Sequence, residues 1–234
     1  MSGGFFVNEG RRYSAIAILR SQKHPGSITG LFIVLCLVTF SIHYISLSVL
    51  FNDDVYYDFY SDRLTYEKIG TLLELKNKWE WLLYPFLIIF LYLKLLIVAA
   101  ILYVAVLLTD YHRQDFKSLF KIALLGEFIF LFQPLLRLIW YGIFQPDYSL
   151  KDLQNFVPFS LLGLMDQTSI NQVLVYPLTI LNILEVVYVV ILSQLVSEKI
   201  DSGFSVGLKI VLGSYGTGLV LWVLCITFMT VSLS

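Results

Sequence analysis

Five ionisable side chains lie inside long apolar segments of the sequence: His43, Lys94, Glu127, Arg137 and Glu185. Charged groups in an apolar environment are costly, so they pair with one another or mark paths for ions and protons. An ammonium group beside a carboxylate could form an ion pair or relay protons. These residues are the first candidates for chemistry in this chain.

Helix geometry predicts which of these residues share a depth. The helices that carry Lys94 and Glu185 are predicted over residues 82–109 and 173–196, with their first residues at the outer side of a membrane. With a rise of about 1.5 Å per residue, Lys94 and Glu185 each lie roughly 18 Å from these outer ends. His43 and Arg137 lie at roughly 12 and 10 Å. We therefore predict that Lys94 pairs with Glu185. Asn182 is expected on the same helical face as Glu185, where it could hydrogen-bond into the pair.

Two interpretations of this intramembrane charged cluster stay open. It could be a buried ion pair that fixes the register of the helices, or a site for transport or proton relay. Glu127 lies about 9 Å from the inner end of its segment, within reach of interfacial water, so we expect a structural role for it. Arg137 could extend to the interface or join Lys94, and the surplus of positive charge could then receive an anionic ligand.

Signatures of enzymes and of cofactor sites are absent from the sequence. It contains no Gly-rich Lys-Ser/Thr loop, no His-Glu-x-x-His and no Gly-x-Ser-x-Gly motif. Cys36 and Cys225 lie in separate apolar segments without metal-ligand or redox spacing. We therefore predict no catalytic residue, no metal site and no cofactor. The net charge of −1 also disfavours binding of nucleic acid.

The composition places the chain in a membrane. Hydrophobic residues make up 58% and charged residues 14% of the sequence, and the mean hydropathy is +0.78, whereas soluble domains contain about 25% charged residues. A spanning helix needs about 20 predominantly apolar residues. We predict an all-α polytopic membrane protein with five transmembrane helices in one domain, residues 30–234, preceded by a cytoplasmic segment, residues 1–29. The predicted helices cover residues 30–51, 82–109, 121–144, 173–196 and 207–233.

The basic residues predict the orientation, because cytoplasmic flanks of transmembrane helices carry an excess of Lys and Arg. With the N-terminus inside, more of them fall on the cytoplasmic side than on the outer side. The cytoplasmic set is Arg11, Arg12, Arg20, Lys23, Arg113, Lys117, Lys121, Lys199 and Lys209, and the outer set is Arg63, Lys68, Lys76, Lys78 and Lys151. We therefore predict a cytoplasmic N-terminus and an external C-terminus.

Two segments have the pattern of interfacial helices. Residues 11–23 place basic side chains around apolar ones, as in a helix on an anionic membrane surface or in an ordinary basic flank. Residues 64–81 mix apolar and charged side chains, which predicts an amphipathic helix or an extension of the second transmembrane helix. Residues 52–62, rich in Asp and Tyr, could hold a cation or a partner, but they are expected to form a solvated loop.

Prolines and small residues indicate where helices bend or pack closely. Pro85, Pro134 and Pro177 fall inside predicted helices, where proline frees backbone groups. The last predicted helix and its approach carry small residues at spacings that allow close helix packing. These packing residues are Gly203, Gly207, Gly213, Ser214, Gly216 and Gly218.

The second half of the chain resembles the bacterial members of the Yip-domain family of five-span membrane proteins. The matching features are Val157-Pro158-Phe159-Ser160-Leu161-Leu162-Gly163, the short polar hairpin 197–207 and the glycine-rich last helix. The resemblance implies a five-helix bundle with a cytosolic N-terminus and a short external C-terminus. Eukaryotic relatives are adaptors in membrane traffic that bind small GTPases, but their Asp-Leu-Tyr-Gly-Pro signature is missing here.

Two functions are therefore predicted. The first is a non-enzymatic accessory or scaffold subunit of a larger membrane assembly, with the lipid bilayer and other membrane subunits as partners and the bacterial inner membrane as location. The alternative is a small-solute or proton-coupled transporter that uses the midplane charged cluster. The odd number of helices and the lack of an internal repeat favour the first.

Overall fold

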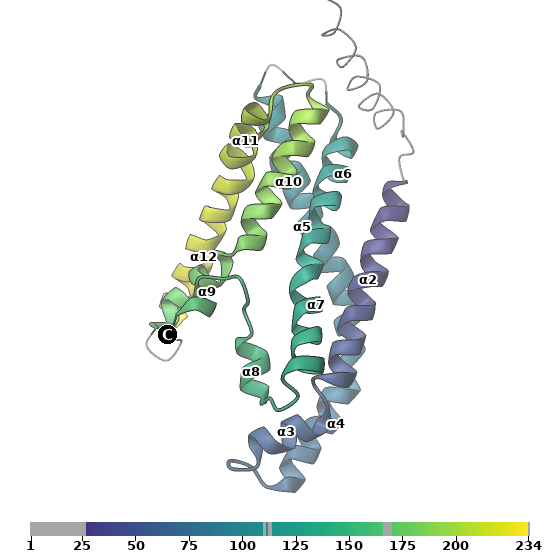
Figure 1. The fold of residues 1–234 in the computed structure, drawn as a ribbon, viewed down its shortest axis with the longest axis vertical. Coiled ribbons are helices and arrows are strands. Elements are labelled where there is room, and N and C mark those ends of the chain that lie inside the picture. Colours follow the sequence, from purple (N-terminus) through teal and green to yellow (C-terminus); the bar gives the residue numbers. More distant parts are fainter. Residues whose placement is uncertain (1–26, 110, 112–113, 166–169, 234) are drawn as a thin grey trace, which may run out of the picture.

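The computed structural model describes residues 27–109, 111, 114–165 and 170–233, and within them the chain is helical (Figure 1). The long helices run between an upper and a lower end of the molecule in the view of Figure 1. They are α2 (Ile28–Val49), α5 (Leu83–Leu107), α6 (Phe116–Glu127) with α7 (Phe132–Ile139), α10 (Ile183–Lys199), and α11 (Phe204–Val211) with α12 (Thr217–Leu233). The predicted all-α fold class is confirmed for the described residues.

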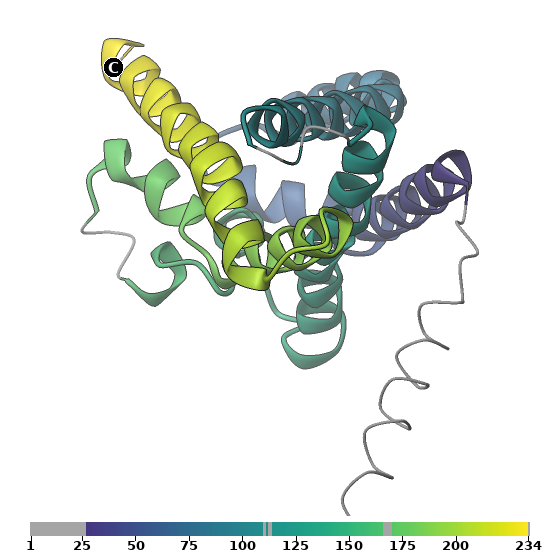
Figure 2. The ribbon, with the colours of Figure 1, turned by 90° about the horizontal axis from the view of Figure 1, so that it is seen from above.

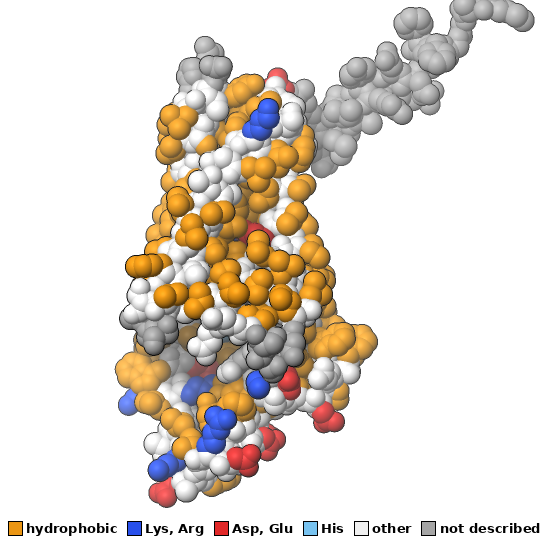
Figure 3. All heavy atoms as spheres, turned by 90° about the vertical axis from the view of Figure 1, so that its left-hand side faces the viewer, with side chains coloured by type: hydrophobic (Ala, Val, Ile, Leu, Met, Phe, Trp, Pro, Cys, Tyr) orange, Lys and Arg blue, Asp and Glu red, His pale blue; other side chains and the backbone are white. Residues whose placement is uncertain are grey.

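Four helical segments are long and apolar enough to cross a membrane: Ile28–Val49, Leu83–Leu107, Phe116–Phe144 and Phe204–Ser232. Their apolar side chains point outward as well as inward, and Figure 3 shows a largely hydrophobic middle on one face above a lower end rich in charges. Such a surface is unfavourable in water. The structure is thus compatible with a multi-pass membrane protein, and these segments match the first, second, third and fifth predicted helices.

The fourth predicted helix is not continuous. In place of one helix over 173–196, the structure has α9 (Gln172–Ile180) and α10, separated at Leu181 and Asn182. Pro177 lacks the N–H that would continue the hydrogen bonding of α9. The separating residues pair instead with an upstream loop, because Leu161 N–H donates to the Leu181 carbonyl (2.9 Å) and Ile183 N–H donates to the Phe159 carbonyl (3.0 Å). Tertiary backbone pairing therefore replaces the predicted helical turn.

Short helices form the lower end of the molecule. They are α3 (Asp53–Tyr60), α4 (Tyr66–Glu80) and α8 (Leu150–Asn155). The amphipathic helix predicted over 64–81 is confirmed by α4. The solvated loop predicted over 52–62 is wrong, because the Asn52 side chain accepts a hydrogen bond from Val55 N–H (3.1 Å) and caps α3.

Two hydrophobic cores of unequal size hold the helices together. The larger core joins α5, α6, α10 and α11 through fully buried side chains such as Leu102, Leu124 and Leu192. The smaller core contains Leu50, Tyr141 and Leu153 at the lower end. Seen from above, α12 points away from the other long helices, and α9 packs against it (Figure 2). Residues 1–26, with the predicted interfacial segment 11–23, lie outside the described residues.

Candidate functional site

A buried ion pair joins α5 to α6. Lys94 Nζ lies 2.6 Å from Glu127 Oε1, and the Glu127 side chain is 6% exposed while that of Lys94 is 34% exposed. The Lys94 ammonium also lies over the ring of Phe130, 4.1 Å from its centroid. The predicted pairing of Lys94 with Glu185 is therefore wrong. Because the third helix begins at Phe116 rather than at residue 121, Glu127 lies roughly 16 Å from its upper end and reaches the depth of Lys94.

Glu185 has a different partner. The Tyr215 hydroxyl donates a hydrogen bond to Glu185 Oε1 and joins α10 to the last helix. Lys94 lies near enough to Glu185 for an electrostatic interaction, although the two do not form an ion pair. Asn182 was predicted to lie on the helical face of Glu185, and this prediction is wrong. It precedes α10 as its N-cap. Its side-chain oxygen accepts from Glu185 N–H (2.8 Å) and so fixes the first turn that carries the carboxylate.

Tyr188 lies near enough to both acidic side chains for an electrostatic interaction. It is 0% exposed, and its ring lies 4.9 Å from that of Phe130 and 5.2 Å from that of Tyr215, measured between centroids. Gly126 makes room for it, because a Cβ atom there would lie 2.7 Å from Tyr188 Cε2. Among the described residues, neither the Tyr188 hydroxyl nor Glu127 Oε2 has a hydrogen-bond partner.

We call Lys94, Glu127, Glu185, Tyr188 and Tyr215 the polar cluster. Sequence reasoning missed both tyrosines and assigned Glu127 to the interface. The signal for Tyr188 was its place three residues after Glu185, which puts both on one helical face. No pattern in the sequence pointed to Tyr215.

Three helices depart from regular α geometry where they carry the polar cluster. A 3-10 turn (Phe128–Leu131) follows Glu127, the break at Leu181 and Asn182 precedes Glu185, and Tyr215 lies in a π-helical turn (Leu212–Gly216). Single π-helical turns are frequent at functional sites. Irregular backbone at membrane depth is tolerated where protein surrounds it. The irregular turns of these three helices thus coincide with the polar cluster.

His43 and Arg137 do not join the polar cluster. His43 lies on α2 with its ring edge-on to Tyr84, at a centroid distance of 6.0 Å. The Arg137 guanidinium on α7 lies 5.6 Å from the centroid of the Phe51 ring, near the smaller core. His43 Nε2 and Arg137 Nε are buried without a hydrogen-bond partner among the described residues. The predicted charged cluster is therefore divided between two parts of the molecule.

The predicted packing residues also divide into two groups. Gly207 brings α11 against α10 so closely that a Cβ atom would overlap the Ser193 carbonyl oxygen, and Ser214 is buried with its hydroxyl donating to the Ile210 carbonyl (2.6 Å). Gly218 faces Ile101 of α5, at 3.3 Å from the position of a Cβ atom. By contrast, Gly203 and Gly213 have nothing within 4 Å of that position, and Gly216 meets only its own helix.

Four cavities in the described part of the chain lie away from the polar cluster. Their volumes are about 590, 500, 420 and 80 Å³, and none has a residue of the polar cluster in its walls. Within the same described ranges, no group of three His, Cys, Asp or Glu side chains is placed to hold a metal ion.

Comparisons with known proteins add no family to this description. No family model, curated protein or solved structure matches the chain. Over its described residues, the fold and the site define an all-helical protein with four helices long and apolar enough to cross a membrane and a polar cluster between its helices.

Proposed function

We propose that this chain is a non-enzymatic integral membrane protein that acts through helix packing, as an accessory or scaffold subunit of a larger membrane assembly. The observation that carries the proposal is the way the acidic groups of the polar cluster are engaged. Glu127 is paired with Lys94 and Glu185 with Tyr215, and neither carboxylate lines the cavities of about 590, 500, 420 and 80 Å³ in the described part of the chain. Engaged charges between helices favour a role in fixing their register.

In this proposal the chain crosses the bilayer five times, as the Yip-like resemblance implies. The path of the chain supports the fifth crossing, because α8, α9 and α10 lead from the lower end of α7 back to the upper end, where α11 begins (Figure 1). The broken α9–α10 segment would complete the crossing, and α12 runs back toward the lower half. The basic flanks then favour a cytoplasmic N-terminus and an external C-terminus, in a bacterial inner membrane.

Purification in a gentle detergent tests the proposal. The tagged full-length protein is expected to retain a membrane protein in stoichiometric amount, identified by mass spectrometry. Gly213→Leu should release this partner if it packs on the open face of the last helix, because no described residue lies within 4 Å of a Cβ atom at this position. Gly142→Leu is the matched control, since Gly142 also lies in a π-helical turn and is also open. A lone monodisperse protein would contradict the proposal.

A proton-coupled transporter is the second candidate, and one observation favours it. Glu127 Oε2 and the Tyr188 hydroxyl are buried without partners among the described residues, beside helices whose geometry is irregular at that depth. Such groups could pass a proton between the two carboxylates. In liposomes with a pH-sensitive dye inside, the wild type should then carry protons and Glu185→Gln should not. Equal and negligible flux for both proteins would exclude this candidate.

A further inference from the structure

A groove between the first turns of α2, the middle of α5 and the first turns of α6 has the dimensions of a ligand site. Its volume is about 590 Å³, and small-molecule sites range over roughly 300–1,000 Å³. Most of its wall is apolar: Phe32 comes from α2, Tyr92 and Leu96 from α5, and Phe120 from α6. Phe32 and Tyr92 meet edge to face, at a centroid distance of 5.7 Å, on one side of the groove.

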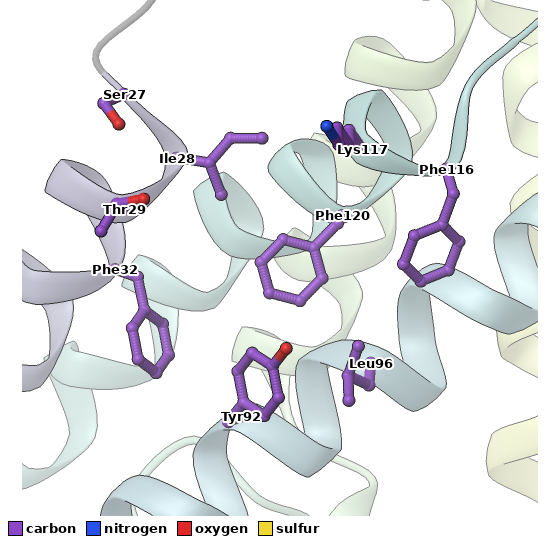
Figure 4. Close-up of a pocket in the computed structure, with 9 residues that line it drawn as sticks. All are labelled: Ser27, Ile28, Thr29, Phe32, Tyr92, Leu96, Phe116, Lys117 and Phe120. Atoms are coloured by element: carbon purple, nitrogen blue, oxygen red, sulfur yellow. The ribbon is translucent and has the colours of Figure 1, made fainter.

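Three polar side chains of this groove lie together at one end, and the Tyr92 hydroxyl lies further in. Figure 4 shows Ser27, Thr29 and Lys117 toward the end where α2 and α6 begin, with Phe32 and Tyr92 further into the groove. The site is therefore divided into a polar rim and an apolar interior. A phospholipid has the same division between headgroup and acyl chain, whereas a water-soluble solute does not.

The charge of the rim is positive. No carboxylate lines the groove, and Lys117 forms no ion pair with any described residue. The nearest acid in sequence, Asp115, is engaged elsewhere, because its carboxylate accepts from the Ser118 hydroxyl (2.7 Å) and lies 4.0 Å from Lys199 Nζ. The Lys117 ammonium is thus available to an anion at the level where the helices begin.

We propose that this groove binds one anionic phospholipid. The phosphate lies at Lys117, with the hydroxyls of Ser27 and Thr29 as further donors, and one acyl chain lies along the surface formed by Phe32, Tyr92 and Leu96. The positive rim selects the headgroup charge, since each basic side chain near an anionic membrane surface attracts it. The apolar interior accepts the chain without regard to the headgroup. The proposal is independent of whether the protein acts as a scaffold or as a transporter.

Native mass spectrometry of the full-length, delipidated protein tests the charge selection. Titration with phosphatidylglycerol, which is anionic, and with phosphatidylcholine, which is zwitterionic, should give one tightly retained phosphatidylglycerol per chain. Lys117→Glu should weaken its binding at least about five-fold, the factor that corresponds to about 1 kcal/mol per basic side chain. Lys209→Glu is the matched control, because this exposed lysine in the last turn of α11 lies outside the groove. Equal losses in both variants, or equal retention of both lipids, would overturn the proposal.

A second variant tests the position of the acyl chain. Leu96→Trp fills the apolar interior and should reduce the retention of phosphatidylglycerol more than ten-fold. Helix content and thermal stability, measured in the same detergent, should stay close to those of the wild type, because Leu96 is only partly buried. Undiminished retention by a folded Leu96→Trp protein would place the lipid elsewhere. Displacement of the lipid by a stoichiometric protein partner would also overturn the assignment.

Discussion

Two basic residues, Lys94 and Arg137, lie within helices that are apolar enough to cross a membrane, yet their surroundings differ. Lys94 has an acidic partner at 2.6 Å and lies beside the larger core. Arg137 has no carboxylate partner among the described residues and lies beside a core of three buried side chains. In the upper bundle, which is built on the larger core, the Glu127 carboxylate therefore offsets the cost of burying the Lys94 charge. In the lower part, beside the smaller core, no described carboxylate offsets the cost of burying the Arg137 charge. The difference indicates that charge pairing holds the upper bundle in register, while the lower part relies on apolar contacts.

The largest expected effect is the loss of the ion pair. Glu127→Leu leaves Lys94 without its carboxylate and should lower the free energy of unfolding by about 3 kcal/mol. Adding Lys94→Met should restore most of this loss, because the pair is replaced by apolar contacts. Unfolding in mixed micelles, followed by circular dichroism, measures both changes.

A double variant of the pair predicted from sequence is the control for this comparison. Lys94→Met combined with Glu185→Leu should show no such rescue, since Glu127 would stay buried without its partner. If Lys94→Met combined with Glu127→Leu had the same free energy of unfolding as Glu127→Leu alone, the ion pair would not be the interaction that stabilises the upper bundle.

The next effect concerns the close approach of α10 and α11 in the same bundle. Gly207→Ala should destabilise the protein by about 2 kcal/mol, because the new methyl group meets the Ser193 carbonyl and lies 2.9 Å from Ser197 Cβ. Gly203→Ala, one turn earlier with nothing within 4 Å, should change stability by less than about 0.5 kcal/mol. If the two variants unfolded at the same temperature, the contact between α10 and α11 would accommodate the added methyl group, and the close approach at Gly207 would not contribute to stability.

A smaller effect of opposite sign is expected for Arg137. Arg137→Leu should raise the free energy of unfolding by about 1 kcal/mol, because it removes a charge that has no carboxylate partner in the described structure. The interaction with the Phe51 ring is lost at the same time and limits the gain. A destabilisation as large as that of Glu127→Leu would mean that the lower region holds its charge as firmly as the upper bundle does.

The smallest effect is expected at α8, outside the apolar segments. Hydrogen bonds from the Ser149 N–H and hydroxyl hold the pKa of Asp152 below its ordinary value. Because the folded pKa is the lower one, this stabilisation is complete above about pH 4 and is lost as the pH falls through the folded pKa. Asp152→Ala should cost less than about 0.5 kcal/mol at pH 6, because the group is largely solvated. Thermal unfolding should show no difference between this variant and the wild type at pH 2.

Much of the helical framework could be predicted from the sequence, because apolar segments of sufficient length are a local property. Four of the predicted helices appear within a few residues of their predicted bounds. The break at Leu181 could not be predicted in this way, since it depends on backbone pairing with Phe159 and Leu161, residues distant along the chain. Asn182 was predicted to lie on the helical face of Glu185, but its role as an N-cap follows from that break.

The site was predicted only in part. Lys94 and Glu185 were identified because charges are rare in apolar segments, and both lie at the polar cluster. Their partners were not identified, because the partner of a buried charge depends on which helices pack together and on where each helix begins. Tyr188 and Tyr215 carry no charge, so the same rule overlooked them.

The sequence by itself determined that this protein is helical and apolar enough for a membrane, because composition and segment length are sums over neighbouring residues. Only the tertiary structure decided that Glu127 pairs with Lys94, that Tyr215 donates to Glu185, and that Arg137 has no carboxylate partner among the described residues. The physical reason is the short range of these contacts. A hydrogen bond or ion pair needs its atoms within about 3 to 4 Å, and a shift of one helical turn, about 5.4 Å, is enough to exchange one partner for another.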